Sequence, residues 1–171
     1  MEVTRVAPFL DYWEKLRQRT RRVVDRIPAE HLEWTWKPGK FSPGDLVRHL
    51  AGIERWMYAE NAQRRPSRYP GHAEALARGL PAVREYFERL HAESMEIFRG
   101  LSDEDLAAKC VTPGGAEITI RKWLRLMTEH EIHHRGQIYL LLAMLGVETP
   151  PLYGMTSEQV RERSVAPEKE D

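Results

Sequence analysis

The sequence contains little of several features that mark particular classes of protein. Cys110 is the single cysteine in 171 residues, which excludes an intrachain disulfide and fits a reducing compartment. The 26 basic and 26 acidic residues give a formal net charge of zero. No excess of positive charge therefore attracts nucleic acid or an anionic membrane surface, and we expect neither as a partner.

Long hydrophobic runs are also missing. The longest apolar stretch, residues 138–147, is much shorter than the roughly 20 residues that a membrane-spanning helix needs. The N-terminal stretch MEVTRVAPFLDYWEKL carries charged residues in every turn, unlike a signal peptide or an anchor. We expect a cytoplasmic protein.

Apolar residues recur every three to four positions in four segments of about twenty residues, which is the pattern of amphipathic helices. Pro28 ends the first segment, because proline in the next turn would lose a hydrogen bond and clash. Ser42 and Asp45 form a pair resembling a capping box at the start of the second. The expected helices cover residues 7–27, 42–63, 80–98 and 119–145.

The connections between these helices differ in length. Residues 64–79, with two prolines and a glycine, are long enough for a crossover rather than a tight hairpin. Residues 109–119 contain Pro-Gly-Gly between short apolar runs and could form a small extended hairpin. The sequence thus predicts an all-α four-helix bundle that forms a single domain over residues 1–163, with a disordered tail at 164–171.

Histidines interrupt the apolar stripe of the fourth helix. His130 and His134 are four residues apart and so share one helix face. His49 lies among apolar residues of the second helix and also points into the bundle. Three imidazoles from facing helices could hold a divalent metal ion with open coordination positions, as in catalytic sites. Core histidines with ordinary hydrogen bonds are the alternative.

The other histidines have different environments. His133 lies about 100° around the helix from His134 and is expected at the rim of the site. His31, His72 and His91 are expected at the surface. The run HEIHH also matches the metalloprotease pattern H-E-x-x-H, with Glu131 as the base, but the longer form with a downstream glycine and third histidine is missing.

The combination of SPGDLVRHLAGIERW (42–56), HEIHHRGQIYLLLAMLG (130–146) and PPLYG (150–154) resembles the DinB-like family. The resemblance implies a four-helix bundle with up-down-down-up connectivity and a long crossover between helices 2 and 3, often in a dimer. It also implies a divalent metal site formed by His49, His130 and His134. Some members are transferases or isomerases that use bacillithiol, mycothiol or related thiols.

These observations, together with the resemblance, favour a metal-dependent enzyme that acts on a small molecule. The leading hypothesis is an S-transferase that uses a low-molecular-weight thiol of the bacillithiol type. Hydrolysis of a small amide or ester is one alternative, and a non-catalytic, metal-stabilised stress-response binding module is another. Zinc suits three neutral histidines best, with nickel, iron and manganese as alternatives. Glu131 and Glu54 are candidate proton carriers, although each can also be an exposed, ion-paired carboxylate.

Arginines and loop aromatics suggest contacts beyond the metal site. Arg48, Arg55 and Arg135 are candidates for holding a substrate carboxylate. A homodimer is expected from the resemblance, and aromatic residues in the loops add exposed apolar area that often marks a contact. These aromatic residues are Trp34, Trp36, Tyr69 and Tyr153.

Overall fold

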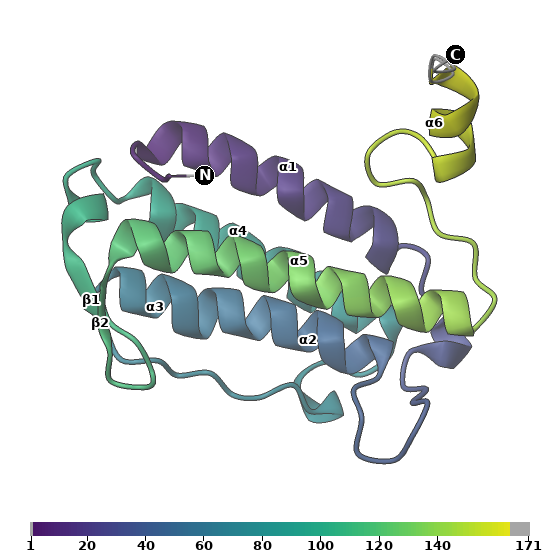
Figure 1. Cartoon of the computed structure of the whole chain (residues 1–171). Helices are drawn as coiled ribbons and strands as arrows, with labels where there is room; N and C mark the ends of the chain where they lie inside the picture. The colour runs from purple at the N-terminus through teal and green to yellow at the C-terminus, as the bar shows by residue number, and fades with distance from the viewer. Residues whose placement is uncertain (1, 165–171) are drawn as a thin grey trace, which may run out of the picture.

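The computed structural model describes residues 2–164, in which long helices form a four-helix bundle (Figure 1). The predicted all-α bundle is confirmed, and residues 165–171 of the predicted tail lie outside the described residues. The helices are α1 (Val6–Val24), α2 (Pro43–Ile53) with its continuation α3 (Ala59–Ala62), α4 (Leu80–Arg99) and α5 (Ile120–Met144).

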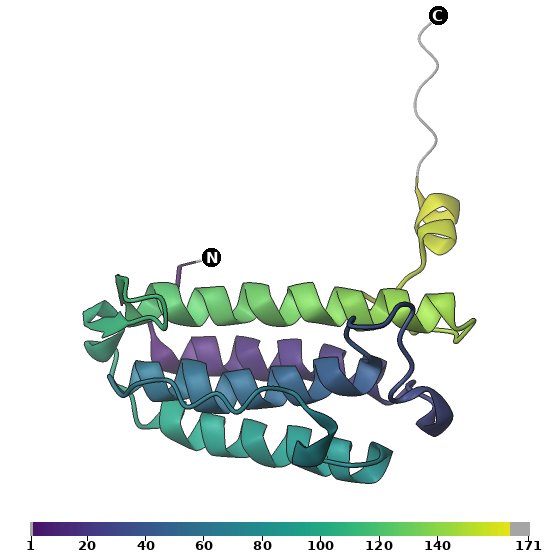
Figure 2. The same ribbon diagram turned by 90° about the horizontal axis from the view of Figure 1, so that it is seen from below.

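The helices run in the order up, down, down, up. Figures 1 and 2 show α1 and α5 running in one direction and α2 and α4 in the other. Side-chain contacts agree with this order. The Tyr86 side chain lies beside Gly52, and Arg55 pairs with Glu93, so residue numbers increase in the same direction along α2 and α4. Two consecutive helices that run in the same direction need a connection that spans the length of a helix. The linker of residues 64–79 provides this connection.

A π-helical turn, Glu54–Tyr58, joins α2 to α3. In a regular α-helix, residues nine positions apart lie on opposite faces. Here His49 and Tyr58 both face α5, with ring centroids 5.0 and 5.9 Å from that of His130. The wider turn thus changes the helix register between these two residues, and such turns frequently occur at functional sites.

The interior is divided by a polar layer. Arg17, Glu54, His91 and Glu131 come from all four helices, and each is at most 3% exposed. Separate apolar clusters fill the bundle on either side of this layer. One cluster includes Trp13, Leu16 and Phe98, and the other includes Val23, Leu50 and Phe87.

A small hairpin and a short helix are among the elements outside the bundle helices. The predicted hairpin is present as β1 (Lys109–Val111) paired antiparallel with β2 (Glu117–Thr119), and burial raises the pKa of the Cys110 thiol in β1. Beyond α5, the helix α6 (Ser157–Arg163) starts at a capping box formed by Thr156 and Gln159. The sequence pattern does not predict this helix. Among the described residues, no helix is long and apolar enough to cross a membrane.

Candidate metal centre

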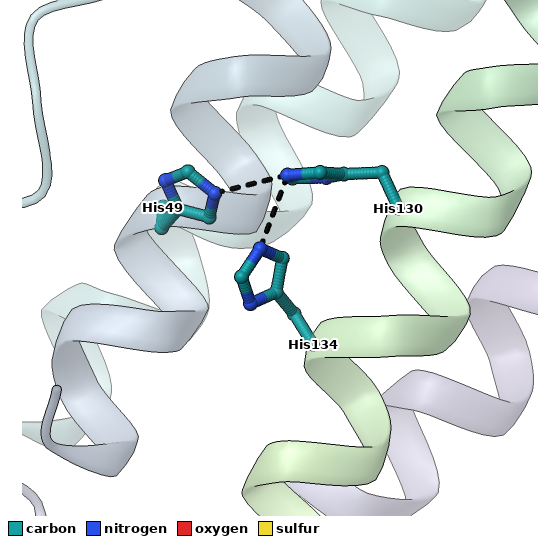
Figure 3. A group of neighbouring side chains, drawn as sticks. All are labelled: His49, His130 and His134. Atoms are coloured by element: carbon teal, nitrogen blue, oxygen red, sulfur yellow. Dashed lines mark hydrogen bonds between the residues drawn. The ribbon is translucent and has the colours of Figure 1, made fainter.

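Three histidines converge between α2 and α5, as Figure 3 shows. The Nε2 atom of His130 lies 3.2 Å from Nε2 of His49 and 3.1 Å from Nε2 of His134. One ring nitrogen from each histidine falls within 4.8 Å of the other two. The structure therefore brings together all three residues that the sequence indicated as metal ligands.

The spacing of these nitrogens fits a common metal ligand set. With metal–nitrogen bonds of about 2.0–2.1 Å, ligand nitrogens lie about 3.3 Å apart in a tetrahedral site and about 2.9 Å apart in an octahedral one. The two Nε2 separations lie between these values. The histidines can thus occupy three positions around one ion and leave further positions open.

Hydrogen bonds on the far side of two rings fix their orientation. Gln137 Oε1, an acceptor, lies 2.7 Å from His134 Nδ1, so this nitrogen carries the proton and His134 Nε2 has the lone pair. His49 Nδ1 lies 2.6 Å from the hydroxyl of Tyr69 and can donate to it in the same way. His130 Nε2 then faces two lone pairs, and one proton cannot satisfy both well. A cation between the three nitrogens does.

The electrostatic surroundings keep these imidazoles neutral. Burial, together with the neighbouring His134 and His130, lowers the pKa of His49 to about 3. Burial and His134 lower the pKa of His130 to about 4, and burial also lowers the pKa of His134. Neutral imidazoles are the form that binds a metal ion, so the lone pairs are available at pH 7.

Loop residues before and after α2 lie beside the histidines. Tyr69 and His72 belong to the linker of residues 64–79, and the Tyr69 hydroxyl lies 3.4 Å from His72 Nδ1. His72 is half-buried here, whereas the sequence predicted a surface position. Phe41 stacks near His49, with its ring centroid 4.6 Å from that of His72. His133 is exposed and contacts Gln137, as a rim residue would.

The two candidate proton carriers lie in the polar layer of the bundle. Glu54 is ion-paired with Arg17 and His91, and Glu131 Oε2 lies 3.5 Å from the same arginine. Burial alone would raise the pKa of Glu54, but Arg17 and His91 lower it, whereas burial raises the pKa of Glu131. Both carboxylates are ion-paired but buried rather than exposed, and His91 is buried with them, which corrects its predicted surface position.

A sequence model of one family matches most of the chain. The match to the DinB superfamily covers residues 12–138, from the first helix through the histidines of α5. This chain belongs to the DinB superfamily. The two halves of the site, His49 on α2 and His130 with His134 on α5, both lie within the matched residues.

Individual DinB-like proteins share the fold at low sequence identity. YjoA of Bacillus subtilis is 22% identical over 139 residues, which cover 80% of this chain and 88% of YjoA. Its structure superposes with a TM-score of 0.69, at 19% identity over 85% of this chain and 96% of that one. YfiT of Bacillus subtilis, described as a probable metal-dependent hydrolase with an unusual four-helix bundle topology, gives a TM-score of 0.66 at 17% identity, covering 84% and 89% of the chains. A mycothiol-dependent maleylpyruvate isomerase gives 0.59 at 13% identity, covering 78% and 60%.

Replacing Tyr69 with phenylalanine is expected to weaken metal binding about tenfold or more, because His49 loses the partner that orients its ring. Competition with a chromophoric chelator measures the affinity. Tyr86→Phe is the matched control, since the Tyr86 hydroxyl lies against Gly52 of α2. Equal metal affinity of Tyr69→Phe and wild type would contradict the orienting role.

Proposed function

We propose that this DinB-superfamily protein is a metal-dependent enzyme that transfers a low-molecular-weight thiol to an electrophilic small molecule. One observation carries the proposal. Three neutral imidazole nitrogens converge from α2 and α5, and among the described residues no carboxylate joins this group. Such a site can ionise a bound nucleophile, and no described carboxylate lies within ligand distance of all three histidines to act as a general base.

This donor set favours thiol chemistry over water chemistry. A divalent ion held by His49, His130 and His134 supplies positive charge that lowers the pKa of a thiol or a water molecule beside it. A coordinating thiol, whose free pKa is about 8.5, is deprotonated outright beside such an ion, whereas metal-bound water reaches a pKa of about 7. Because the thiol starts closer to neutrality, it ionises there without a separate base and becomes the nucleophile. Zinc is the ion that we propose, since three neutral imidazoles suit it.

Residues of this chain would position the reactants. Phe41 lies in a T-shaped arrangement with His72 and His134, with ring centroids 4.6 and 6.5 Å away, and gives this part of the site an apolar surface. Burial raises the pKa of Tyr69 to about 12, so its hydroxyl stays protonated and can hold His49 while donating toward His72. Glu54 and Glu131 have no part in this chemistry, because both are ion-paired to Arg17 inside the bundle. Without Glu131 as a base, a metallopeptidase mechanism is disfavoured.

Two proteins of similar fold each support one candidate reaction. The mycothiol-dependent isomerase shares the fold and uses a low-molecular-weight thiol, as its name states. YfiT, a probable metal-dependent hydrolase, favours hydrolysis of a small amide or ester as the second candidate. For hydrolysis, the Tyr69–His72 pair beside His49 is a candidate to accept a proton from water.

The test compares conjugation of bacillithiol and mycothiol to a chlorodinitrobenzene electrophile by the zinc-loaded and the chelator-treated protein. We expect thiol-dependent conjugation in the loaded protein and at least a tenfold lower rate after chelation. Hydrolysis of nitrophenyl esters or anilides without thiol would replace the proposal with the hydrolase. No turnover of any of these substrates by a fully loaded protein would favour a non-catalytic binding module.

We further propose a homodimer without a nucleic-acid partner. The zero net charge removes the general attraction to phosphate. On the outer face of α5, the side chains of Leu140 and Met144 are 61% and 54% exposed, which favours contact with a second copy. Light scattering should give a mass of twice 20.0 kDa.

A further inference from the structure

Three arginines are candidates for binding an anion, and they differ in the partners that surround them in the structure. Arg48 is buried but pairs with Glu33 and Asp45, at 2.7 and 2.9 Å. Arg55 pairs with two glutamates on neighbouring helical segments. For Arg135, no carboxylate of residues 2–164 lies within 4.0 Å of the guanidinium nitrogens, although the residue is only 3% exposed. Arg135 is therefore the one of the three whose charge is not already neutralised by a described side chain.

The hydrogen bonds of Arg135 do not compensate for this missing anion. Its Nη1 lies 3.4 Å from the Leu16 carbonyl oxygen, and its Nη2 lies 3.4 Å from the Tyr153 hydroxyl. Both distances are at the long limit for N–H···O bonds, and both acceptors are neutral. A buried charge without an opposite charge is strongly unfavourable, so this position favours binding of an anion.

Arg135 also lines a cleft large enough for a ligand. The cleft has a volume of about 630 Å³ and lies between α5 and the segment that follows it. Its apolar walls include Ile132, Leu152 and Met155, with Arg135 as the cation. A side-chain carbon at Gly136 would meet nothing within 4 Å, so the helix surface is open to a ligand here. Volumes of about 300–1,000 Å³ with mostly apolar walls and few polar groups are typical of small-molecule sites.

Further positive charge stands at the edge of this cleft. Arg22 donates to the carbonyl oxygen of Pro151, and the Arg19 guanidinium lies 5.4 Å from the ring centroid of Tyr153. Pro151 and Tyr153 are both cleft residues, and Glu158 is the acidic side chain among the lining residues. The balance of charge near the cleft therefore also favours an anion.

The cleft is separate from the metal centre. Tyr139 is nine residues from His130, and Gly136 is two from His134, so the cleft residues lie about half a turn around α5 from the histidines. A ligand in the cleft would contact the side of α5 toward α1, whereas the histidines face α2.

We propose that this cleft is a second ligand site, which binds a small organic carboxylate with an apolar body. The carboxylate pairs with the Arg135 guanidinium and displaces its long contacts, while the body lies on Gly136 between the apolar walls. This site is independent of the metal-dependent reaction proposed above.

The test uses 4-phenylbutyrate as the probe, its neutral amide 4-phenylbutanamide, and inorganic phosphate, with binding measured by calorimetry on the protein as purified. We expect saturable binding of the carboxylate at one site per chain, and at least about tenfold weaker binding of the amide and of phosphate. Equal binding of carboxylate and amide would overturn the role of Arg135. Phosphate binding as tight as the carboxylate would overturn the organic ligand class.

Variants locate the site. Arg135→Met should weaken 4-phenylbutyrate binding at least about tenfold. Because that variant also removes a buried side chain, Gly136→Leu is a second test that fills the open surface and leaves the arginine in place. Gly136→Ala is its matched control and should bind nearly as wild type does. His130→Ala should also bind normally. Wild-type affinity in Gly136→Leu, or loss of binding in His130→Ala, would contradict the assignment of the cleft.

Discussion

Replacing Arg17 with methionine should lower the free energy of unfolding by about 3–5 kcal/mol at pH 7, the range for removing one partner of a buried ion pair. Arg17 is fully buried and contacts both Glu54 and Glu131, which are each 1% exposed. Without the guanidinium, Glu131 loses its described ion-pair partner, and Glu54 retains His91. Urea unfolding of the two proteins measures the difference.

Arg21→Met is the matched control, since it makes the same change one turn further along α1. Arg21 is partly exposed and pairs with Glu14 and Glu88 near the surface, so we expect a loss of no more than about 1 kcal/mol. Equal stability of Arg17→Met and wild type would show that the polar layer does not depend on this arginine.

The loss of folding free energy caused by Arg17→Met should depend on pH in a definite direction. Arg17 lowers the pKa of Glu54, so its removal raises that pKa, and burial already raises the pKa of Glu131. When a carboxyl group has a higher pKa in the folded protein than in the unfolded chain, its protonated form favours folding. The free energy of unfolding is then undiminished at a pH below the unfolded-state pKa, and it falls as pH rises through the folded-state pKa. Arg17→Met should therefore lower the free energy of unfolding more at pH 7 than at pH 5.

Replacing His130 with alanine should abolish tight metal binding and any metal-dependent turnover. His130 Nε2 is the nitrogen that lies near both other ligand nitrogens, so its loss leaves two ligands on different helices. Metal binding stabilises the folded state by about 4 kcal/mol at a free concentration of 1,000 times Kd. Addition of zinc should thus raise the Tm of wild type and leave that of His130→Ala unchanged.

His133→Ala is the matched control for His130→Ala, because it removes an exposed imidazole from the same turn of α5. His133 contacts Gln137 rather than the other histidines through its Nε2. We expect a zinc-induced rise in Tm close to that of wild type. A full zinc-induced shift in His130→Ala, or its loss in both variants, would mean that the ion binds elsewhere.

The fold and the three histidines could be predicted from the sequence for related reasons. Helical periodicity in four segments indicates a bundle, and the Ser42–Asp45 pair marks the start of α2. The first helix ends at Val24, three residues before the end at residue 27 that Pro28 predicts. A polar residue on an apolar stripe is visible in the sequence, so His49, His130 and His134 could be identified. Their mutual distances follow from the antiparallel packing of α2 on α5, which periodicity alone does not give.

The surroundings of the histidines could not be predicted in the same way. Tyr69 and His72 lie in a linker without periodicity, and they reach the site because the parallel order of α2 and α4 returns that linker past His49. His91 lies among polar residues of α4, a pattern that indicates solvent, but two glutamates satisfy it inside the bundle. The π-helical turn after α2 has no sequence signal that we could identify.

X-ray absorption spectroscopy of the zinc-loaded protein tests the central claim most directly. The three imidazole nitrogens that converge between α2 and α5 should give scattering from three histidines at about 2.0–2.1 Å, with one ion per chain. The remaining ligands should be light atoms that exchange when a thiol is added, with a sulfur then appearing at about 2.3 Å. A spectrum without imidazole scattering, or one that is unchanged in the His49→Ala variant, would contradict the assignment of this site.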